Sequence, residues 1–271
     1  MRRKILLYAL VVLTLASIAL MCTAGMGEAK WPKTSSSGQK TNGKMKVDTS
    51  NSSEGYFLAG LASKNKHKMK LRVVKGKDTL TYDLNSNGNM EVFPFQLGSG
   101  KYEISLWENV SGKKYSSAGK ITLNVKLKRE DGAFLYPNQY VNYNKKTPAV
   151  KKADELCKNK SEKEAYAIIK KYITDNYHYD YVKAATIKPS VLPDIDTCFT
   201  KRSGVCQDLS AVMICMLRTQ GIPAKLVIGY ADKNYHAWVV TEVDGKKILF
   251  DPTAAVSHSK PASNYSVERY Y

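Results

Sequence analysis

The spacing of apolar residues changes once along this chain, and this change limits the folds that it can adopt. Residues 68–73, 101–107 and 121–127 alternate polar and apolar side chains, as antiparallel strands do when one face meets water. Between residues 161 and 175 the apolar residues instead recur with the three- and four-residue spacing of a helix face. The pattern predicts a small all-β, sandwich-like domain followed by a domain in which helices precede strands.

Composition divides the chain further. Residues 30–50 are rich in Ser, Lys, Thr and Gly, which predicts a flexible linker. The small β domain is expected over residues 51–130, with turns at 85–88 and 98–100. Residues 131–150 contain many turn formers and little periodicity, so we expect an ordered linker there. The second domain is then expected to occupy residues 151–271.

The N-terminus has the composition of a targeting segment. Three basic residues at 2–4 precede an apolar run at 5–21, and small residues follow it. This order is typical of a secretory signal peptide, which we expect over residues 1–29. A mainly apolar run of seventeen residues is nearly long enough to span a bilayer, so an uncleaved membrane anchor is an alternative, as is lipidation at Cys22. The expected location is outside the cell or on the surface of a bacterial envelope.

The chain carries a formal net charge of +18, which should attract it to anionic polymers such as those of a cell wall. The alternative is that the charge only keeps the protein soluble. No nucleic-acid-binding motif is present, so no specific nucleic acid is expected. The cysteines do not form CxxC pairs and Asp83–Gly88 lacks the last ligand of a calcium loop, so we expect no metal and no cofactor. A disulfide between Cys157 and Cys198 is left open.

One cysteine stands where a helix should begin. Apolar residues from 209 to 217 predict a helix that Gly221 and Pro223 end, and Cys206 lies in its first turn. The helix dipole and the unpaired N–H groups of a first turn stabilise a thiolate, which is the nucleophilic form of cysteine. The same N–H groups can stabilise an oxyanion. Gly204, just before, would let the backbone approach closely.

A hairpin should bring a histidine and an aspartate together. Asp244 and Gly245 have the composition of a two-residue turn. With this turn, Trp238 would face Asp251 and His236 would face Thr253. His236 and Asp251 would then be diagonal neighbours, about 7–8 Å apart at the backbone, which a hydrogen bond between side chains can bridge. Either residue alone could be structural, but their conjunction with Cys206 favours a catalytic site.

These residues belong to four motifs that together resemble the transglutaminase-like superfamily. The motifs are SGVCQDLS at 203–210, MLRTQGIPA at 216–224, HAW at 236–238 and FDPT at 250–253. The resemblance covers residues 150–257 and leaves the first 130 residues outside. It implies an α+β, papain-like C-terminal domain with Cys206 as nucleophile, His236 as general base and then acid, and Asp251 as the residue that orients the imidazole.

The resemblance implies acyl transfer from protein or peptide amides through a thioester on Cys206, but it leaves the acceptor open. Water would make the protein a peptidase, whereas a lysine amine would make it a transglutaminase. The side chain that completes the oxyanion site is also open, with Gln207 and Tyr177 as weak candidates. The alternative to an enzyme is a non-catalytic protein that binds the cell surface and retains the fold.

Overall fold

The computed structural model describes residues 28–188 and 190–271. The predicted signal peptide or anchor therefore lies almost wholly outside the described residues. Within the described ranges, no helix combines the length and apolar character needed to cross a membrane.

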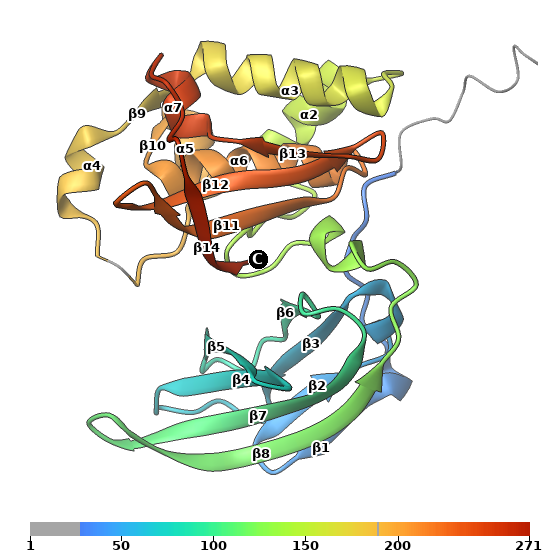
Figure 1. Cartoon of the computed structure of the whole chain (residues 1–271). Coiled ribbons are helices and arrows are strands. Elements are labelled where there is room, and N and C mark those ends of the chain that lie inside the picture. Colours follow the sequence, from blue (N-terminus) through green and yellow to red (C-terminus); the bar gives the residue numbers. More distant parts are fainter. Residues whose placement is uncertain (1–27, 189) are drawn as a thin grey trace, which may run out of the picture.

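The N-terminal part consists of two four-stranded antiparallel sheets that pack face to face (Figure 1). In spatial order, the first sheet contains β1 (Gln39–Asn42), β2 (Met45–Asp48), β3 (Tyr56–Leu61) and β6 (Glu91–Pro94). The second contains β5 (Asp78–Leu84), β4 (Met69–Lys75), β7 (Gly100–Ser111) and β8 (Lys114–Val125). Alternate residues of β4 are buried, and the rings of Tyr82 and Phe93 meet between the sheets at 5.1 Å. The all-β, sandwich-like architecture is as predicted.

The prediction of a flexible linker over residues 30–50 is wrong for much of that range. β1 and β2 lie within it, and Met45 and Val47 of β2 are fully buried in the sandwich core. Asp48 is buried too, and its carboxylate accepts hydrogen bonds from the N–H groups of Ser35 and Ser50. The Ser- and Lys-rich composition concealed a short strand, because two apolar residues at alternate positions are enough to join a sheet that is already formed.

The C-terminal part has helices packed on an antiparallel sheet, which confirms the α+β prediction. The sheet order is β13 (Lys246–Phe250), β12 (Asn234–Val243), β11 (Ala224–Ala231) and β14 (Tyr265–Tyr270). The helices are α2 (Pro148–Cys157), α3 (Glu162–Asn176), α4 (Tyr181–Thr186), α5 (Ile195–Lys201), α6 (Cys206–Thr219) and α7 (Pro252–Val256). Two short strands, β9 (His178–Tyr179) and β10 (Ser203–Gly204), pair in parallel between them.

Helix α3 forms as its sequence predicts. The Ser161 side chain accepts from the N–H of Glu164, and the Glu164 side chain accepts from the N–H of Ser161, which is the expected capping box. Ala165, Ile169 and Ile173 form its buried face.

Helix α6 is more deeply buried than an amphipathic helix. Every residue from Asp208 to Thr219 is buried, whereas the apolar spacing predicted one buried stripe. The reason is its position between β11 and β12 on one side and α2, α3 and α5 on the other. A helix enclosed on all sides needs small or apolar residues around its whole circumference.

A buried arginine in the last turn of α6 joins three separate segments. The Arg218 guanidinium is fully buried and donates to the carbonyls of Tyr136 at 2.6 Å, Ala224 at 2.9 Å and Tyr271 at 2.9 Å. Burial lowers its pKa to about 10, so it stays charged at neutral pH. It thereby fixes the linker between the domains and the last residue of the chain to the central helix.

Arg218→Met should destabilise the protein strongly. The substitution keeps most of the apolar stem but leaves buried carbonyl groups without their charged donor, at a cost of about 3–5 kcal/mol. Urea unfolding at pH 7 measures the change. Arg129→Met is the control, because this half-exposed arginine forms a surface ion pair with nearby Asp131 and its loss should cost less than about 1 kcal/mol. Equal losses in the two variants would contradict the anchoring role of Arg218.

Candidate active site

Cys206 is the first residue of α6, as predicted. Val205 before it is extended, and its N–H donates to the Asp208 carboxylate at 3.0 Å. Position 204 requires glycine because neighbouring side chains approach its backbone closely. A Cβ there would lie 2.7 Å from Cys198 Sγ and 2.8 Å from Asp208 Cβ. The turn is therefore tight, and the Cys206 side chain starts at the positive end of the central helix.

The Asp208 carboxylate holds the segments around this turn together. It is fully buried, and besides the Val205 N–H it binds Lys183 Nζ at 2.6 Å and the N–H of Asp194 at 3.1 Å. These contacts tie α4 and the start of α5 to the base of α6. The sequence analysis did not identify Asp208 or Lys183 as site residues, because an acid at the third position of a helix is usually a simple cap.

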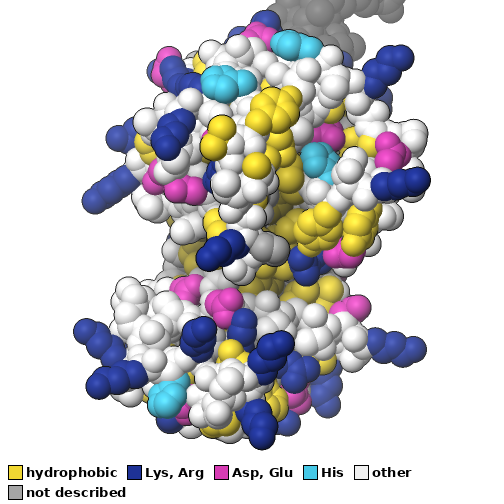
Figure 2. Space-filling model, turned by 90° about the vertical axis from the view of Figure 1, so that its left-hand side faces the viewer, with side chains coloured by type: hydrophobic (Ala, Val, Ile, Leu, Met, Phe, Trp, Pro, Cys, Tyr) yellow, Lys and Arg dark blue, Asp and Glu magenta, His cyan; other side chains and the backbone are white. Residues whose placement is uncertain are grey.

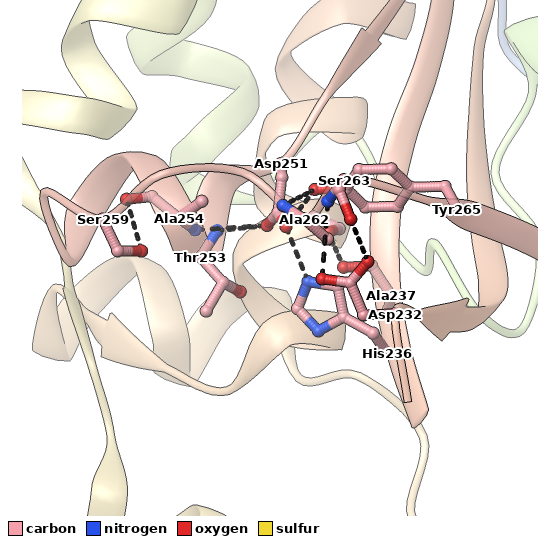
Figure 3. A network of polar contacts seen from close by, with 11 residues as sticks. Asp232, His236, Ala237, Asp251, Thr253, Ala254, Ser259, Ala262, Ser263 and Tyr265 are labelled. Atoms are coloured by element: carbon pink, nitrogen blue, oxygen red, sulfur yellow. Dashed lines mark hydrogen bonds and ion pairs between the residues drawn. The ribbon is translucent and has the colours of Figure 1, made fainter. Parts of the chain in front are cut away.

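His236, Asp251 and Tyr265 form a connected polar network (Figure 3). His236 Nε2 lies 2.9 Å from Asp251 Oδ2, and the Tyr265 hydroxyl donates to the same oxygen at 2.9 Å. Asp251 Oδ1 accepts from the N–H groups of Thr253 at 3.0 Å and Ala254 at 3.2 Å, as the N-cap of α7. Four donors thus fix the carboxylate, and the carboxylate fixes the plane of the imidazole.

The predicted hairpin forms in the expected register but ends one residue early. Val243 pairs with Lys246 around the Asp244–Gly245 turn, and the last pair is Val239 with Phe250. Asp251 then leaves the strand to cap α7, so the predicted pairings of Trp238 with Asp251 and of His236 with Thr253 do not form. Pro252 explains the break, because it sets the backbone for a first helical turn. The predicted contact between His236 and Asp251 is nevertheless made.

The charges of the network favour a protonated histidine. Burial by itself would lower the pKa of His236, but hydrogen bonds with Asp251 and Cys206 outweigh it and raise the pKa from 6.5 to about 9. Burial opposes ionisation of Asp251, yet the bonds from His236, Tyr265 and Ala254 lower its pKa. Cys206 contributes to this upward pKa shift, and it lines the same cavity as His236. Since Nε2 faces Asp251, Nδ1 is left as the ring nitrogen for Cys206.

The other described cysteines differ from Cys206. Cys157, Cys198 and Cys215 are buried, and all four cysteines in the described ranges are free, so the open pairing of Cys157 with Cys198 is not formed. Burial raises the pKa of Cys157 to about 11 and that of Cys198 to about 12. These thiols are therefore protonated at neutral pH and inert as nucleophiles.

Cys206 and His236 both line a cavity of about 570 Å³. Tyr179 and Gln207 also line it, and the Gln207 amide donates to the carbonyl of Val191 at 2.9 Å. Tyr177, the other sequence candidate for an oxyanion donor, is buried outside this lining, and its hydroxyl accepts from Arg202 at 2.8 Å. The candidate oxyanion donors that border this cavity are therefore the backbone N–H groups at the start of α6 and the side chain of Gln207.

Two aromatic residues support the imidazole, and sequence reasoning did not assign either to the site. Trp238 lies two residues after His236, with the rings 6.4 Å apart and 21° from parallel, and Tyr265 meets Trp238 edge-on. The alternation of 265–270 could have predicted the strand β14, but not that its first residue reaches Asp251. Within the described ranges, no group of three or more His, Cys, Asp or Glu residues could hold a metal ion.

One part of the chain matches a known protein family. Residues 150–252 match the sequence model of the transglutaminase-like superfamily. A search of curated proteins found no match.

Similar solved structures share little sequence with this chain. A candidate cysteine protease from Cytophaga hutchinsonii is 16% identical, with a TM-score of 0.40, over 86% of this chain and 90% of the other. The transglutaminase of red sea bream is 12% identical, with a TM-score of 0.34, over 73% of this chain and 47% of the other. The match of residues 150–252 includes Cys206, His236 and Asp251, so the part of the chain that carries the site matches the transglutaminase-like superfamily.

Proposed function

We propose that the protein is a cysteine acyl-transfer enzyme that acts on protein or peptide amides. The observation that carries the proposal is that one cavity is lined both by Cys206, at the N-terminus of a buried helix, and by the His236 imidazole that Asp251 orients. A nucleophile, a proton carrier and an orienting carboxylate in contact are the parts that acyl transfer through cysteine requires.

The order of steps follows from these contacts. The Cys206 thiolate attacks the amide carbonyl carbon, forming a C–S bond, and N–H groups at the start of α6 stabilise the oxyanion. The His236 imidazolium gives its proton to the departing amine as the C–N bond breaks, leaving a thioester. Neutral His236 then takes a proton from the acceptor as the acceptor attacks the thioester carbon, and the C–S bond breaks to release the Cys206 thiolate. Water as acceptor yields a carboxylate, and a primary amine yields a new amide.

We further propose that this enzyme works outside the cell or at the cell surface, attached by residues 1–29 if these are not cleaved. Its charge of +18 supports adhesion to an anionic cell-wall polymer. The same charge, with the accessory β domain, supports the second candidate function, a non-catalytic surface-binding protein. A decaying site would be expected to lose at least one member of the triad, which favours the enzyme.

His236 should titrate near pH 9, as followed by its ring signals in NMR spectra. Because the folded pKa lies above the unfolded value of 6.5, the stability that protonated His236 contributes is present below pH 6.5 and is lost as the pH rises through about 9. Asp251→Asn should lower this pKa by about one unit or more. Asp232→Asn is the matched control, since exposed Asp232 binds only the nearby 263–264 turn. An unchanged His236 titration in Asp251→Asn would contradict the assigned ion pair.

Cys206 should react with iodoacetamide at pH 7 at least about tenfold faster than free cysteine, because reactive cysteine nucleophiles typically lie at a helix N-terminus beside a histidine. Mass spectrometry of proteolytic peptides separates its modification from that of Cys22, while buried Cys157, Cys198 and Cys215 serve as internal controls. Reaction no faster than that of free cysteine would remove the basis for an activated nucleophile.

The acceptor is determined by incubating the protein with glutaminyl peptides and unfolded proteins, with and without a primary amine. Incorporation of the amine would identify a transglutaminase, and new peptide termini would identify a peptidase. Either product should fall by about a thousandfold or more in Cys206→Ala and persist in Cys157→Ala. If neither product forms across a broad set of substrates, the non-catalytic function is favoured.

A further inference from the structure

The cavity that contains Cys206 and His236 lies between the two domains. Thr81 and Asp83 of β5, in the N-terminal domain, line it together with Tyr235 and Arg269 of the C-terminal domain. A second cavity of about 570 Å³ shares Thr81, Tyr140 and Arg269 with the first. A third shares Asp83, Gln139 and Leu192 with it. The three cavities therefore adjoin one another, and residues of β5 between Asp78 and Leu84 contribute to the lining of all three, which together are called the cleft below.

β5 is an edge strand, and its outer edge carries backbone groups that β4 does not use. Its partner β4 lies on one side, and within the described ranges no strand pairs with its other side. Lys75 and Asp78 close a two-residue hairpin, so this pair exchanges backbone hydrogen bonds. The next pair does not, and the two kinds of pair alternate from there along the strands. Thr79, Thr81 and Asp83 belong to the non-bonded pairs, and their N–H and C=O groups point away from β4. The Gln139 side chain, which donates to the carbonyl of Asp83 at 2.6 Å, confirms this direction.

The C-terminal domain contributes a cluster of apolar side chains to the lining of the cleft, which is called the apolar wall below. Ile187, Val191 and Leu192, which lie between α4 and α5, line the cavity together with Tyr235. Val191, Leu192 and Tyr235 are 44%, 40% and 52% exposed, although large apolar side chains usually avoid water. Figure 2 views this face, where hydrophobic side chains gather on the C-terminal domain and in the hollow below it, while Lys and Arg occupy the surrounding surface.

A polar strand edge facing an apolar wall matches one kind of ligand, an extended polypeptide. Such a ligand adds a strand to a free edge through backbone hydrogen bonds, and its side chains on the other side enter apolar sites. We propose that an unfolded or extended segment of a protein substrate binds along β5, with apolar side chains against Val191, Leu192 and Tyr235. This inference rests on the proposed function, since it places the scissile amide at Cys206. It also gives the β domain a direct part in the substrate site.

Binding can be measured without catalysis in the full-length Cys206→Ala variant, with fluorescein-labelled β-casein as an unfolded probe and ubiquitin as a folded one. Fluorescence anisotropy should detect β-casein and not ubiquitin. Thr81→Pro removes an outward N–H that β4 does not use, so the sheet is retained, and β-casein binding should weaken about tenfold. Thr81→Val keeps the backbone and should change binding by less than about twofold.

A second pair of variants tests the apolar wall. Leu192→Asp should weaken β-casein binding about fivefold or more. Leu249→Asp should not, since Leu249 is similarly exposed, at 45%, but lies on β13 outside the cleft. Far-UV circular dichroism and, in the Cys206 background, the rate of iodoacetamide labelling verify that each variant is folded.

The outcomes separate this inference from the proposed function. Absence of β-casein binding, or binding indifferent to both Thr81→Pro and Leu192→Asp, overturns the inference even if the enzyme is active. Edge-dependent binding without any turnover by the unmodified protein supports the groove and overturns the proposed chemistry.

Discussion

The burial of α6 is the constraint on which the rest of the C-terminal domain depends. Because sheet strands and four other helices pack against it, its position is fixed at both ends. At its N-terminus, Asp208 uses its buried carboxylate to hold the turn before Cys206. At its C-terminus, Arg218 binds three carbonyl groups. A nucleophile on such a helix keeps its direction without needing a rigid loop.

The second half of the site depends on one carboxylate rather than on a helix. Asp251 ends β13, caps α7 and accepts from both His236 and Tyr265. Its position is therefore set by the strand before it, the helix after it and the last strand of the sheet. The low solvent exposure of the pair, 14% for the His236 side chain and 5% for that of Asp251, strengthens their interaction, because water screens it poorly there.

The same anchoring explains how the two domains form one cleft. Arg218 holds the linker through the carbonyl of Tyr136, and the ring of Tyr140 stacks on that of Tyr271 at 3.5 Å. Gln96 of the β domain donates to the carbonyl of Tyr270. The linker and the C-terminus thus meet between the domains and set the separation of β5 from the wall around Leu192. The described contacts make the β domain part of the surface around Cys206 rather than a distant appendage.

The sequence by itself determined the local features of this protein. The capping box of α3, the start of α6 at Cys206, the hairpin at Asp244 and the two fold classes each follow from residues close together in the chain, whose local preferences agree with the tertiary structure. The prediction from sequence was wrong for residues 30–50. Their polar composition indicated a flexible linker, although Met45 and Val47 alternate with polar residues as in a strand. Only the tertiary structure decided that Asp251 caps a helix instead of extending a strand, that Tyr265 and Asp208 support the site, and that β5 borders it. These contacts join residues far apart in sequence, and no local pattern encodes which distant side chain fills a given space in a packed core.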